Sequence, residues 1–177
     1  MLRSRFCPLC AALLERRVPE LDDRVRHVCA ACGFVLYMNP KVAAGTVPVG
    51  DDGRIVLIRR GIDPGRGRWS WPCGYVEMDE DVPACAVRET REECGLDVEL
   101  GPLLGLYSYP ATAEEGTISG TGMVIVCYRA RVAPAASDAL LAGDDALEAA
   151  WFAADSIPWD DLAFDSSRRG LRDFLVS

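Results

Sequence analysis

The stretch that decides the fold is residues 74–96, GYVEMDEDVPACAVRETREECGL. Pro83 suits the first turn of a helix, where its missing N–H leaves no hydrogen bond unmade. Gly95 is a helix stop signal, because glycine readily adopts the left-handed conformation that ends many helices. The sequence therefore predicts a helix over residues 82–94, with the acidic residues 79–81 near its N-terminus.

Three glutamates share one face of this predicted helix. At 100° per residue, Glu89 lies about 40° from Glu93 and about 60° from Glu92. Like charges at such spacings destabilise an isolated helix by roughly 0.2–0.5 kcal/mol per pair. A solvated acidic face would explain three glutamates alone, but a divalent cation such as Mg²⁺ would also relieve their repulsion. The adjoining face, which we expect to pack on a sheet, carries Val82, Ala86, Val87, Thr90 and Cys94.

The whole segment resembles the box of the Nudix hydrolases, G-x5-E-x7-R-E-U-x-E-E-x-G-U. The matching residues are Gly74, Glu80, Arg88, Glu89, Glu92, Glu93, Gly95 and Leu96. Thr90 stands where the pattern has an aliphatic residue. The resemblance implies an α+β fold with a mixed β-sheet between helices, an α/β/α sandwich. It also implies metal-dependent hydrolysis of a nucleoside diphosphate linked to another group.

The resemblance further implies roles for the charged residues of the box. Glu89, Glu92 and Glu93 would hold Mg²⁺ or Mn²⁺. Arg88 would orient Glu89, and Glu80 would lie near the metal. Metal ions held by carboxylates can activate water and neutralise phosphate charge, so the chemistry needs no catalytic histidine.

Two positions outside the box complete the expected site. Cys73 precedes the box, where the resemblance implies a backbone carbonyl offered to the metal. The family draws its general base from variable downstream loops, and we favour Glu115 for this role. The other candidates for the base are Glu114, Asp144, Asp145 and Glu148.

The N-terminal region carries two C-x-x-C pairs, Cys7/Cys10 and Cys29/Cys32, separated by eighteen residues. This spacing is typical of a structural zinc site with four thiolate ligands. The simplest interpretation is a zinc ribbon that stabilises its own small fold. A nucleic-acid-binding ribbon is the alternative, and it would use Arg16, Arg17, Arg24 and Arg26. The other cysteines, Cys73, Cys85, Cys94 and Cys127, are expected to be core thiols.

Length and charge set the organisation and the classes of partner. The 177 residues divide into a predicted zinc ribbon at 1–36 and a Nudix hydrolase domain at 37–177. The net charge of −8 argues against a general nucleic-acid or membrane surface. No apolar run approaches the ~20 residues of a membrane helix, and no signal-peptide core is evident, so we expect a cytoplasmic protein. A homodimer is an open alternative to a monomer.

The motifs outside the box suggest the substrate class. The order of ribbon, Gly67-x-Trp69, box and Ile157-Pro158-Trp159 resembles the zinc-ribbon Nudix proteins that act on ADP-ribose and FAD. NAD(H) pyrophosphatases also pair a ribbon with the box, but their Ser-Gln-Pro-Trp-Pro-Phe-Pro run is missing here. NAD(H) is therefore the second candidate substrate, and a non-catalytic module that binds nucleotide or RNA is the third hypothesis. The expected substrate contacts are Arg59, Arg68, Tyr75 and Tyr107.

Patterning predicts the remaining elements of the larger domain. The predicted strands span residues 42–49, 54–59, 103–109, 122–132 and 149–152, and a closing helix spans residues 166–176.

Overall fold

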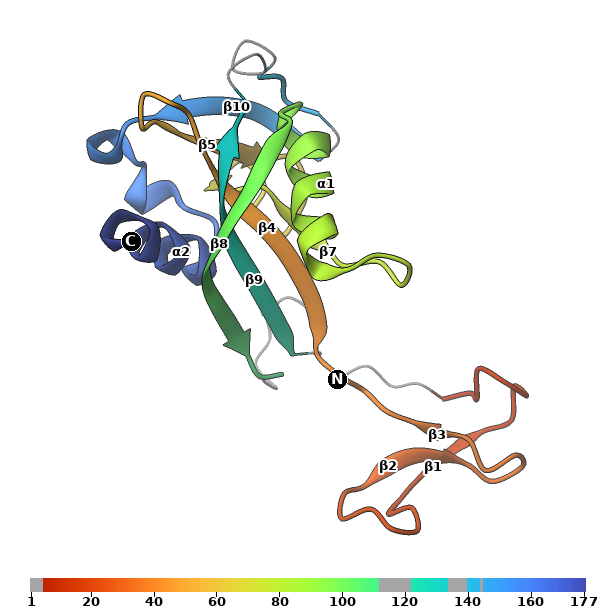
Figure 1. Cartoon of the computed structure of the whole chain (residues 1–177). Helices are drawn as coiled ribbons and strands as arrows, with labels where there is room; N and C mark the ends of the chain where they lie inside the picture. Colours follow the sequence, from red (N-terminus) through yellow and green to blue (C-terminus); the bar gives the residue numbers. More distant parts are fainter. Residues whose placement is uncertain (1–4, 112–121, 134–139, 144) are drawn as a thin grey trace. The chain divides into compact units, whose positions relative to one another are not determined.

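The computed structural model describes residues 5–111, 122–133, 140–143 and 145–177 (Figure 1). The chain divides into two compact units. The described residues of the first unit are 5–40 with Pro110, Ala111 and Gly122, and those of the second are the rest. None of the described helices is long and apolar enough to cross a membrane.

The first unit contains a small antiparallel sheet of three strands. Its strands are β1 (Leu14–Arg17), β2 (Arg26–Cys29) and β3 (Val35–Leu36), with β2 in the centre. Cys29 lies at the end of β2, opposite Leu14 of β1. The sheet thus leads directly into one of the two cysteine pairs.

The second unit is a mixed seven-stranded sheet, with the order β10-β5-β4-β9-β8 and two short strands, β6 and β7, at its side. The pairs are antiparallel except for the parallel pair β4·β9. The strand bounds are β4 (Lys41–Val49), β5 (Ile55–Arg60), β6 (Trp69–Ser70), β7 (Cys73–Tyr75), β8 (Val98–Tyr109), β9 (Met123–Val132) and β10 (Ala146–Phe152). Two 3-10 turns, η2 (Ala154–Ser156) and η3 (Trp159–Asp161), follow β10.

One helix covers each face of this sheet (Figure 1). Along β5, alternation sends Leu57 into the core cluster that contains Leu171 of α2 (Asp165–Val176). It sends Ile58 into the cluster that contains Cys94 of α1 (Val82–Cys94). The expected mixed β-sheet between helices is confirmed.

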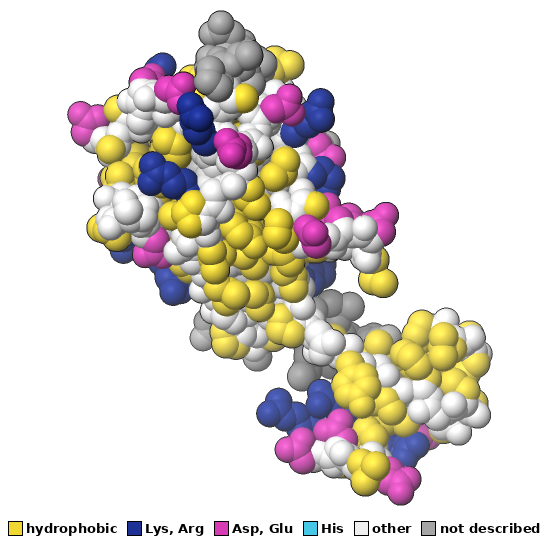
Figure 2. Space-filling view, in the orientation of Figure 1, with side chains coloured by type: hydrophobic (Ala, Val, Ile, Leu, Met, Phe, Trp, Pro, Cys, Tyr) yellow, Lys and Arg dark blue, Asp and Glu magenta, His cyan; other side chains and the backbone are white. Residues whose placement is uncertain are grey.

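The strand β8 forms one edge of the sheet. Two of its leucines, Leu103 and Leu106, are exposed. Figure 2 shows hydrophobic side chains gathered over this part of the larger unit. Register shifts between Leu100 and Leu103 and between Leu103 and Gly105 interrupt its pairing with β9. Such irregularities limit the use of an edge as a template for a further strand.

Most of the predicted elements are confirmed, and α1 has the predicted bounds. The largest difference is in β8, which begins at Val98 rather than at residue 103. Gly101 and Pro102 hid this start, because both residues are unusual inside regular strands. The irregular pairing accommodates them and lets the strand continue.

Candidate active site

The helix α1 begins and ends with strong local signals. Asp81 caps its N-terminus and accepts a hydrogen bond from the Ala84 N–H at 2.7 Å. Gly95 adopts the left-handed conformation with φ of 70°, and its N–H donates to the Arg91 carbonyl. The carboxylates of the box therefore project from a helix with fixed ends.

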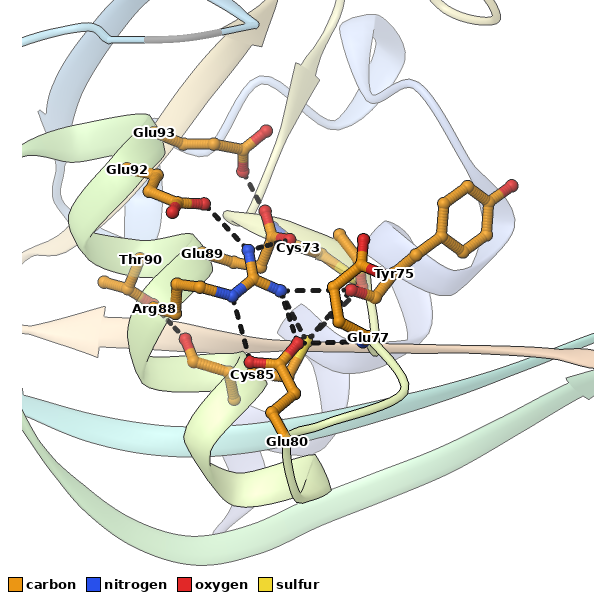
Figure 3. Close-up of polar contacts among 12 residues, drawn as sticks. Cys73, Tyr75, Glu77, Glu80, Cys85, Arg88, Glu89, Thr90, Glu92 and Glu93 are labelled. Atoms are coloured by element: carbon orange, nitrogen blue, oxygen red, sulfur yellow. Dashed lines mark hydrogen bonds and ion pairs between the residues drawn. The ribbon is translucent and has the colours of Figure 1, made fainter.

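Arg88 is the centre of the polar cluster on this helix (Figure 3). Its Nη2 and Nε donate to the two carboxylate oxygens of Glu80, at 2.6 and 3.0 Å. Its Nη1 donates to Glu89 at 2.7 Å and to Glu92 at 2.8 Å. Nη2 also reaches the carbonyl oxygen of Tyr75 at 3.1 Å. One guanidinium thus holds three carboxylates and the backbone of β7 at the start of the box.

The electrostatics of the cluster follow from this arrangement. The hydrogen bonds from Arg88 hold the pKa of Glu80 at about 2, below its usual range. Burial raises the pKa of Glu89, and this effect outweighs the opposing hydrogen bond from Arg88. The pKa of Arg88 itself is raised, chiefly by its hydrogen bond with Glu80.

Glu93 has a different environment from the other three glutamates. Only 4% of its surface is exposed, and its Oε2 accepts a hydrogen bond from the Cys73 N–H at 2.8 Å. Burial raises its pKa to about 7, against the lowering effect of that hydrogen bond. The link from Cys73 places the backbone before the box directly beside Glu93. The Cys73 carbonyl as a metal ligand remains a prediction.

Gly74 allows the close approach of β7 to the helix. A Cβ at this position would collide with the carboxylate of Glu89. A larger residue at this position would displace the Glu89 carboxylate, so the glycine of the box leaves room for that side chain rather than serving a turn.

The glutamate cluster is open. Among the described residues, only the four N-terminal cysteines bring ligand atoms within 4.8 Å of one another. Glu89, Glu92 and Glu93 share a helix face, and Arg88 donates to the carboxylates of Glu89 and Glu92. Mg²⁺ keeps several waters and binds one or two carboxylates directly, so it suits this set of oxygen donors.

Arg60 and Asp145 lie near Glu93. Arg60 was not among the predicted substrate contacts. The charge of Arg60 lowers the pKa of Glu93 and that of Asp145 raises it. Alternation along β5 places Arg60 on the same side as Ile58, toward the end of α1. The strand period could have distinguished Arg60 from its neighbour Arg59.

Arg59 lies apart from the carboxylates of the box. Its guanidinium lies over the Trp69 ring and is 3.6 Å from Glu148 and 3.9 Å from Asp161. Trp69 belongs to the core cluster on the α2 side of the sheet. Arg59 and Glu148 therefore form their own charged group, away from Glu93.

The remaining predicted contacts have mixed outcomes. Tyr107 is a correction: it is 2% exposed and its hydroxyl donates to Asp173, so its ring packs in the core and cannot stack on a substrate. The Tyr75 ring is 42% exposed beneath the Lys41 ammonium group, and it points away from the glutamates (Figure 3). Arg68 is exposed in the loop after β5. Glu115 lies outside the described residues.

The cysteine cluster of the first unit has the dimensions of a zinc site. The Sγ atoms of Cys7 and Cys32 are 3.7 Å apart, and Cys10 lies 3.4 Å from Cys29 and 3.5 Å from Cys32. Tetrahedral Zn–S bonds of about 2.3 Å place sulfurs about 3.8 Å apart. The hydrogen bond from the Cys32 N–H lowers the pKa of the Cys29 thiol to about 7, whereas hydrogen bonds with neighbouring thiols raise the pKa of Cys10. The four thiols therefore fit a zinc ion.

Comparison with known protein families agrees with both units. The Nudix N-terminal family, a zinc ribbon, matches residues 5–38, and the NUDIX domain matches residues 39–174. The chain therefore belongs to the Nudix family. It is a Nudix pyrophosphohydrolase with an N-terminal zinc-ribbon module.

Individual relatives extend the comparison. An ADP-ribose pyrophosphatase of Methanocaldococcus jannaschii is 35% identical over 135 residues, which are 76% of this chain and 73% of the relative. The NAD-capped RNA hydrolase NudC of Stutzerimonas stutzeri is 31% identical over 108 residues, which are 61% of this chain and 37% of that protein. A crystal structure of a Nudix hydrolase from Nitrosomonas europaea has a TM-score of 0.83 and 32% identity, and the match covers 95% of this chain and 88% of that one.

Proposed function

We propose that the protein hydrolyses the pyrophosphate bond of ADP-ribose or FAD in a reaction that depends on Mg²⁺ or Mn²⁺. Water would cleave the P–O–P bond, giving AMP with ribose 5-phosphate from ADP-ribose, or AMP with FMN from FAD. The observation that carries this proposal is the 35% identity to an ADP-ribose pyrophosphatase, over about three quarters of both chains.

The carboxylates of the Nudix helix would hold the metal. Glu89, Glu92 and Glu93 are the proposed ligands, with Glu80 close by and the Cys73 carbonyl as a further oxygen donor. The bound metal supplies positive charge to the pyrophosphate and favours the ionised form of the attacking water. Arg88 keeps Glu80, Glu89 and Glu92 in place by its four hydrogen bonds to these carboxylates.

A base that accepts the proton of the attacking water completes the proposed mechanism. Glu115 remains our first candidate on the sequence. Of the alternatives, Asp145 lies near enough to Glu93 to raise its pKa, whereas Glu148 faces Arg59. The position of Asp145 therefore makes it the better second candidate.

A substrate panel with identified products tests the proposal. With Mg²⁺ or Mn²⁺, we expect kcat/KM for ADP-ribose or FAD to exceed that for NADH, diadenosine polyphosphates and deoxynucleoside triphosphates. Glu93→Gln is the control that should abolish turnover of every substrate. Preference for a nucleoside triphosphate would contradict the proposal.

NAD(H) and NAD-capped RNA form the second candidate substrate class. Matches to NAD-capped RNA hydrolases support it, although the chain spans only about a third of the length of those relatives. NMN and AMP as the preferred products would favour this class. Absence of turnover across the panel with intact metal binding would favour a binding module that does not catalyse.

The domain organisation belongs to the same proposal. Residues 1–36 would form a structural zinc ribbon, and residues 37–177 would carry out the hydrolysis. The four thiols would complete the coordination of zinc, so the ribbon would leave no open metal position for chemistry.

A further inference from the structure

The one departure from the Nudix pattern inside the box has a specific partner in the fold. Thr90 is fully buried, and its hydroxyl lies 2.7 Å from the equally buried hydroxyl of Thr46 on β4. Thr90 also donates to the Ala86 carbonyl at 2.7 Å. Because the Thr90 proton is used there, the Thr46 hydroxyl donates to the Thr90 oxygen. The box thus replaces an aliphatic contact by a directional hydrogen bond.

Thr46 connects this bond to the backbone beside the metal site. Its N–H donates to the Pro72 carbonyl at 3.1 Å, and its neighbour Gly45 pairs with Cys73. The N–H of Cys73 in turn donates to the Glu93 carboxylate. Helix, strand and turn are therefore joined in a closed ring of polar contacts that contains Glu93.

We propose that Thr46 and Thr90 are positioning residues that set the rotation of the Nudix helix against β4, and so hold Glu93 at the Cys73 N–H. Side chains on a helix move together when the helix turns about its axis, so a contact at Thr90 also fixes Glu89 and Glu93. The inference rests on the proposed metal site, because it assigns the two threonines a role in metal binding.

The two hydroxyls differ in their hydrogen bonds, so the two single substitutions should have different effects. Thr90→Val leaves the buried Thr46 hydroxyl without its acceptor, whereas Thr46→Val leaves Thr90 bonded to Ala86. A buried donor without a partner is strongly unfavourable, so Thr90→Val should disturb the packing more. The double variant T46V/T90V removes both groups and restores an apolar contact, as in the family pattern.

Mn²⁺ binding, followed by electron paramagnetic resonance without substrate, is the primary measurement. Melting temperature is recorded in parallel. The controls are Ser70→Ala, which removes the acceptor of a buried hydroxyl as Thr90→Val does, and Ser167→Ala. Ser70 donates to the Trp71 carbonyl and lies 3.0 Å from the buried Ser167 hydroxyl, between β6 and α2, and Ser70→Ala should also lower only the melting temperature. Thr90→Ser is the conservative variant that retains the hydroxyl.

We expect Thr90→Val to weaken Mn²⁺ binding about three- to tenfold, on the scale of a buried hydrogen bond. Thr90→Ser and the double variant should recover most of the affinity, and Ser167→Ala should lower only the melting temperature. Unchanged Mn²⁺ binding by Thr90→Val, with a lower melting temperature, would overturn the positioning role and leave a structural contact. If wild type failed to bind Mn²⁺, or Glu93→Gln bound it equally well, the proposed metal site would be overturned first.

Discussion

The molecule carries two clusters of side chains with the donor chemistry of metal sites, and their geometries differ. The four thiols of the ribbon lie within 4.8 Å of one another, whereas the glutamates of α1 are spread along a helix and held by Arg88. Four thiolates complete a tetrahedron, so such a site is closed. An open carboxylate cluster leaves metal positions for water and phosphate. This difference underlies our proposal that the ribbon would use metal for folding and the helix would use metal for chemistry.

Removal of the ribbon zinc should have the largest effect. In Cys7→Ser/Cys29→Ser, two of four thiolates are lost, and structural zinc sites contribute about 10 kcal/mol or more to folding. We expect the variant to retain no zinc by elemental analysis and to lose the ordered ribbon signals in NMR spectra. Turnover should change less than about threefold, because the metal for chemistry binds elsewhere. Full zinc content in the variant would contradict the predicted ligand set.

Loss of charge on the helix should have the opposite consequence. Glu89→Gln and Glu93→Gln keep the shape of the side chain and remove the charge that holds the metal. Turnover should fall by a factor on the order of 10²–10⁴, equivalent to a few kcal/mol of transition-state stabilisation. Circular dichroism should remain that of the wild type. Near-normal rates in both variants at saturating Mg²⁺ would place the metal elsewhere.

Both clusters follow local rules, so the sequence predicts which side chains lie together, while their roles as metal ligands stay predictions. The spacing of C-x-x-C pairs and the helical period each bring side chains together within a short segment. The environment of Glu93 could not be predicted from the sequence, because its partner Cys73 is twenty residues away and its burial depends on the whole sheet. Tyr107 was assigned wrongly for the same reason, since its partner Asp173 lies on the last helix.

The strands and their arginines also differ in how far local patterns predict them. The five long strands of the larger sheet could be predicted from their apolar patterns, but the short strands β6 and β7 could not, and the early start of β8 depends on pairing with β9. The choice between Arg59 and Arg60 depends on which face of the sheet the metal helix covers. The face that the helix covers depends on the tertiary fold, and a single sequence with a Nudix box does not reveal it directly.

The pH dependence of stability tests the burial of Glu93. Its folded pKa of about 7 exceeds the ordinary value of 4.5, so unfolding releases a proton between these values. Metal-free wild type should therefore lose stability relative to Glu93→Gln as pH rises from about 4.5 to 7, with the difference then constant. We expect roughly 1–3 kcal/mol at pH 8 in urea unfolding with EDTA. An equal pH dependence in both proteins would mean that Glu93 ionises normally.

The smallest expected effect concerns the two adjacent arginines of β5, which also test where the substrate binds. The charge of Arg60 acts on Glu93, but its guanidinium lies over the Phe164 ring and its Nε donates to the Pro64 carbonyl, whereas Arg59 lies over Trp69. If the Arg60 guanidinium leaves these partners to meet a substrate phosphate beside the metal, its loss should raise KM about tenfold, or about 1.4 kcal/mol. Arg59→Ala should change KM less than twofold, and Arg60→Lys should recover part of the loss by restoring the charge.

The arginine variants also test the distinction between the closed thiolate cluster of the ribbon and the open carboxylate cluster of α1. If Arg60→Ala raises KM with kcat nearly unchanged, Arg60 contributes to binding of the ground state and the transition state alike. If Arg59→Ala raises KM instead, the substrate extends over the α2 side of the sheet. In that case Glu148, 3.6 Å from Arg59, would become a stronger candidate for the base than Asp145. Zinc content should be the same in all three arginine variants, because the thiolate site lies in the ribbon.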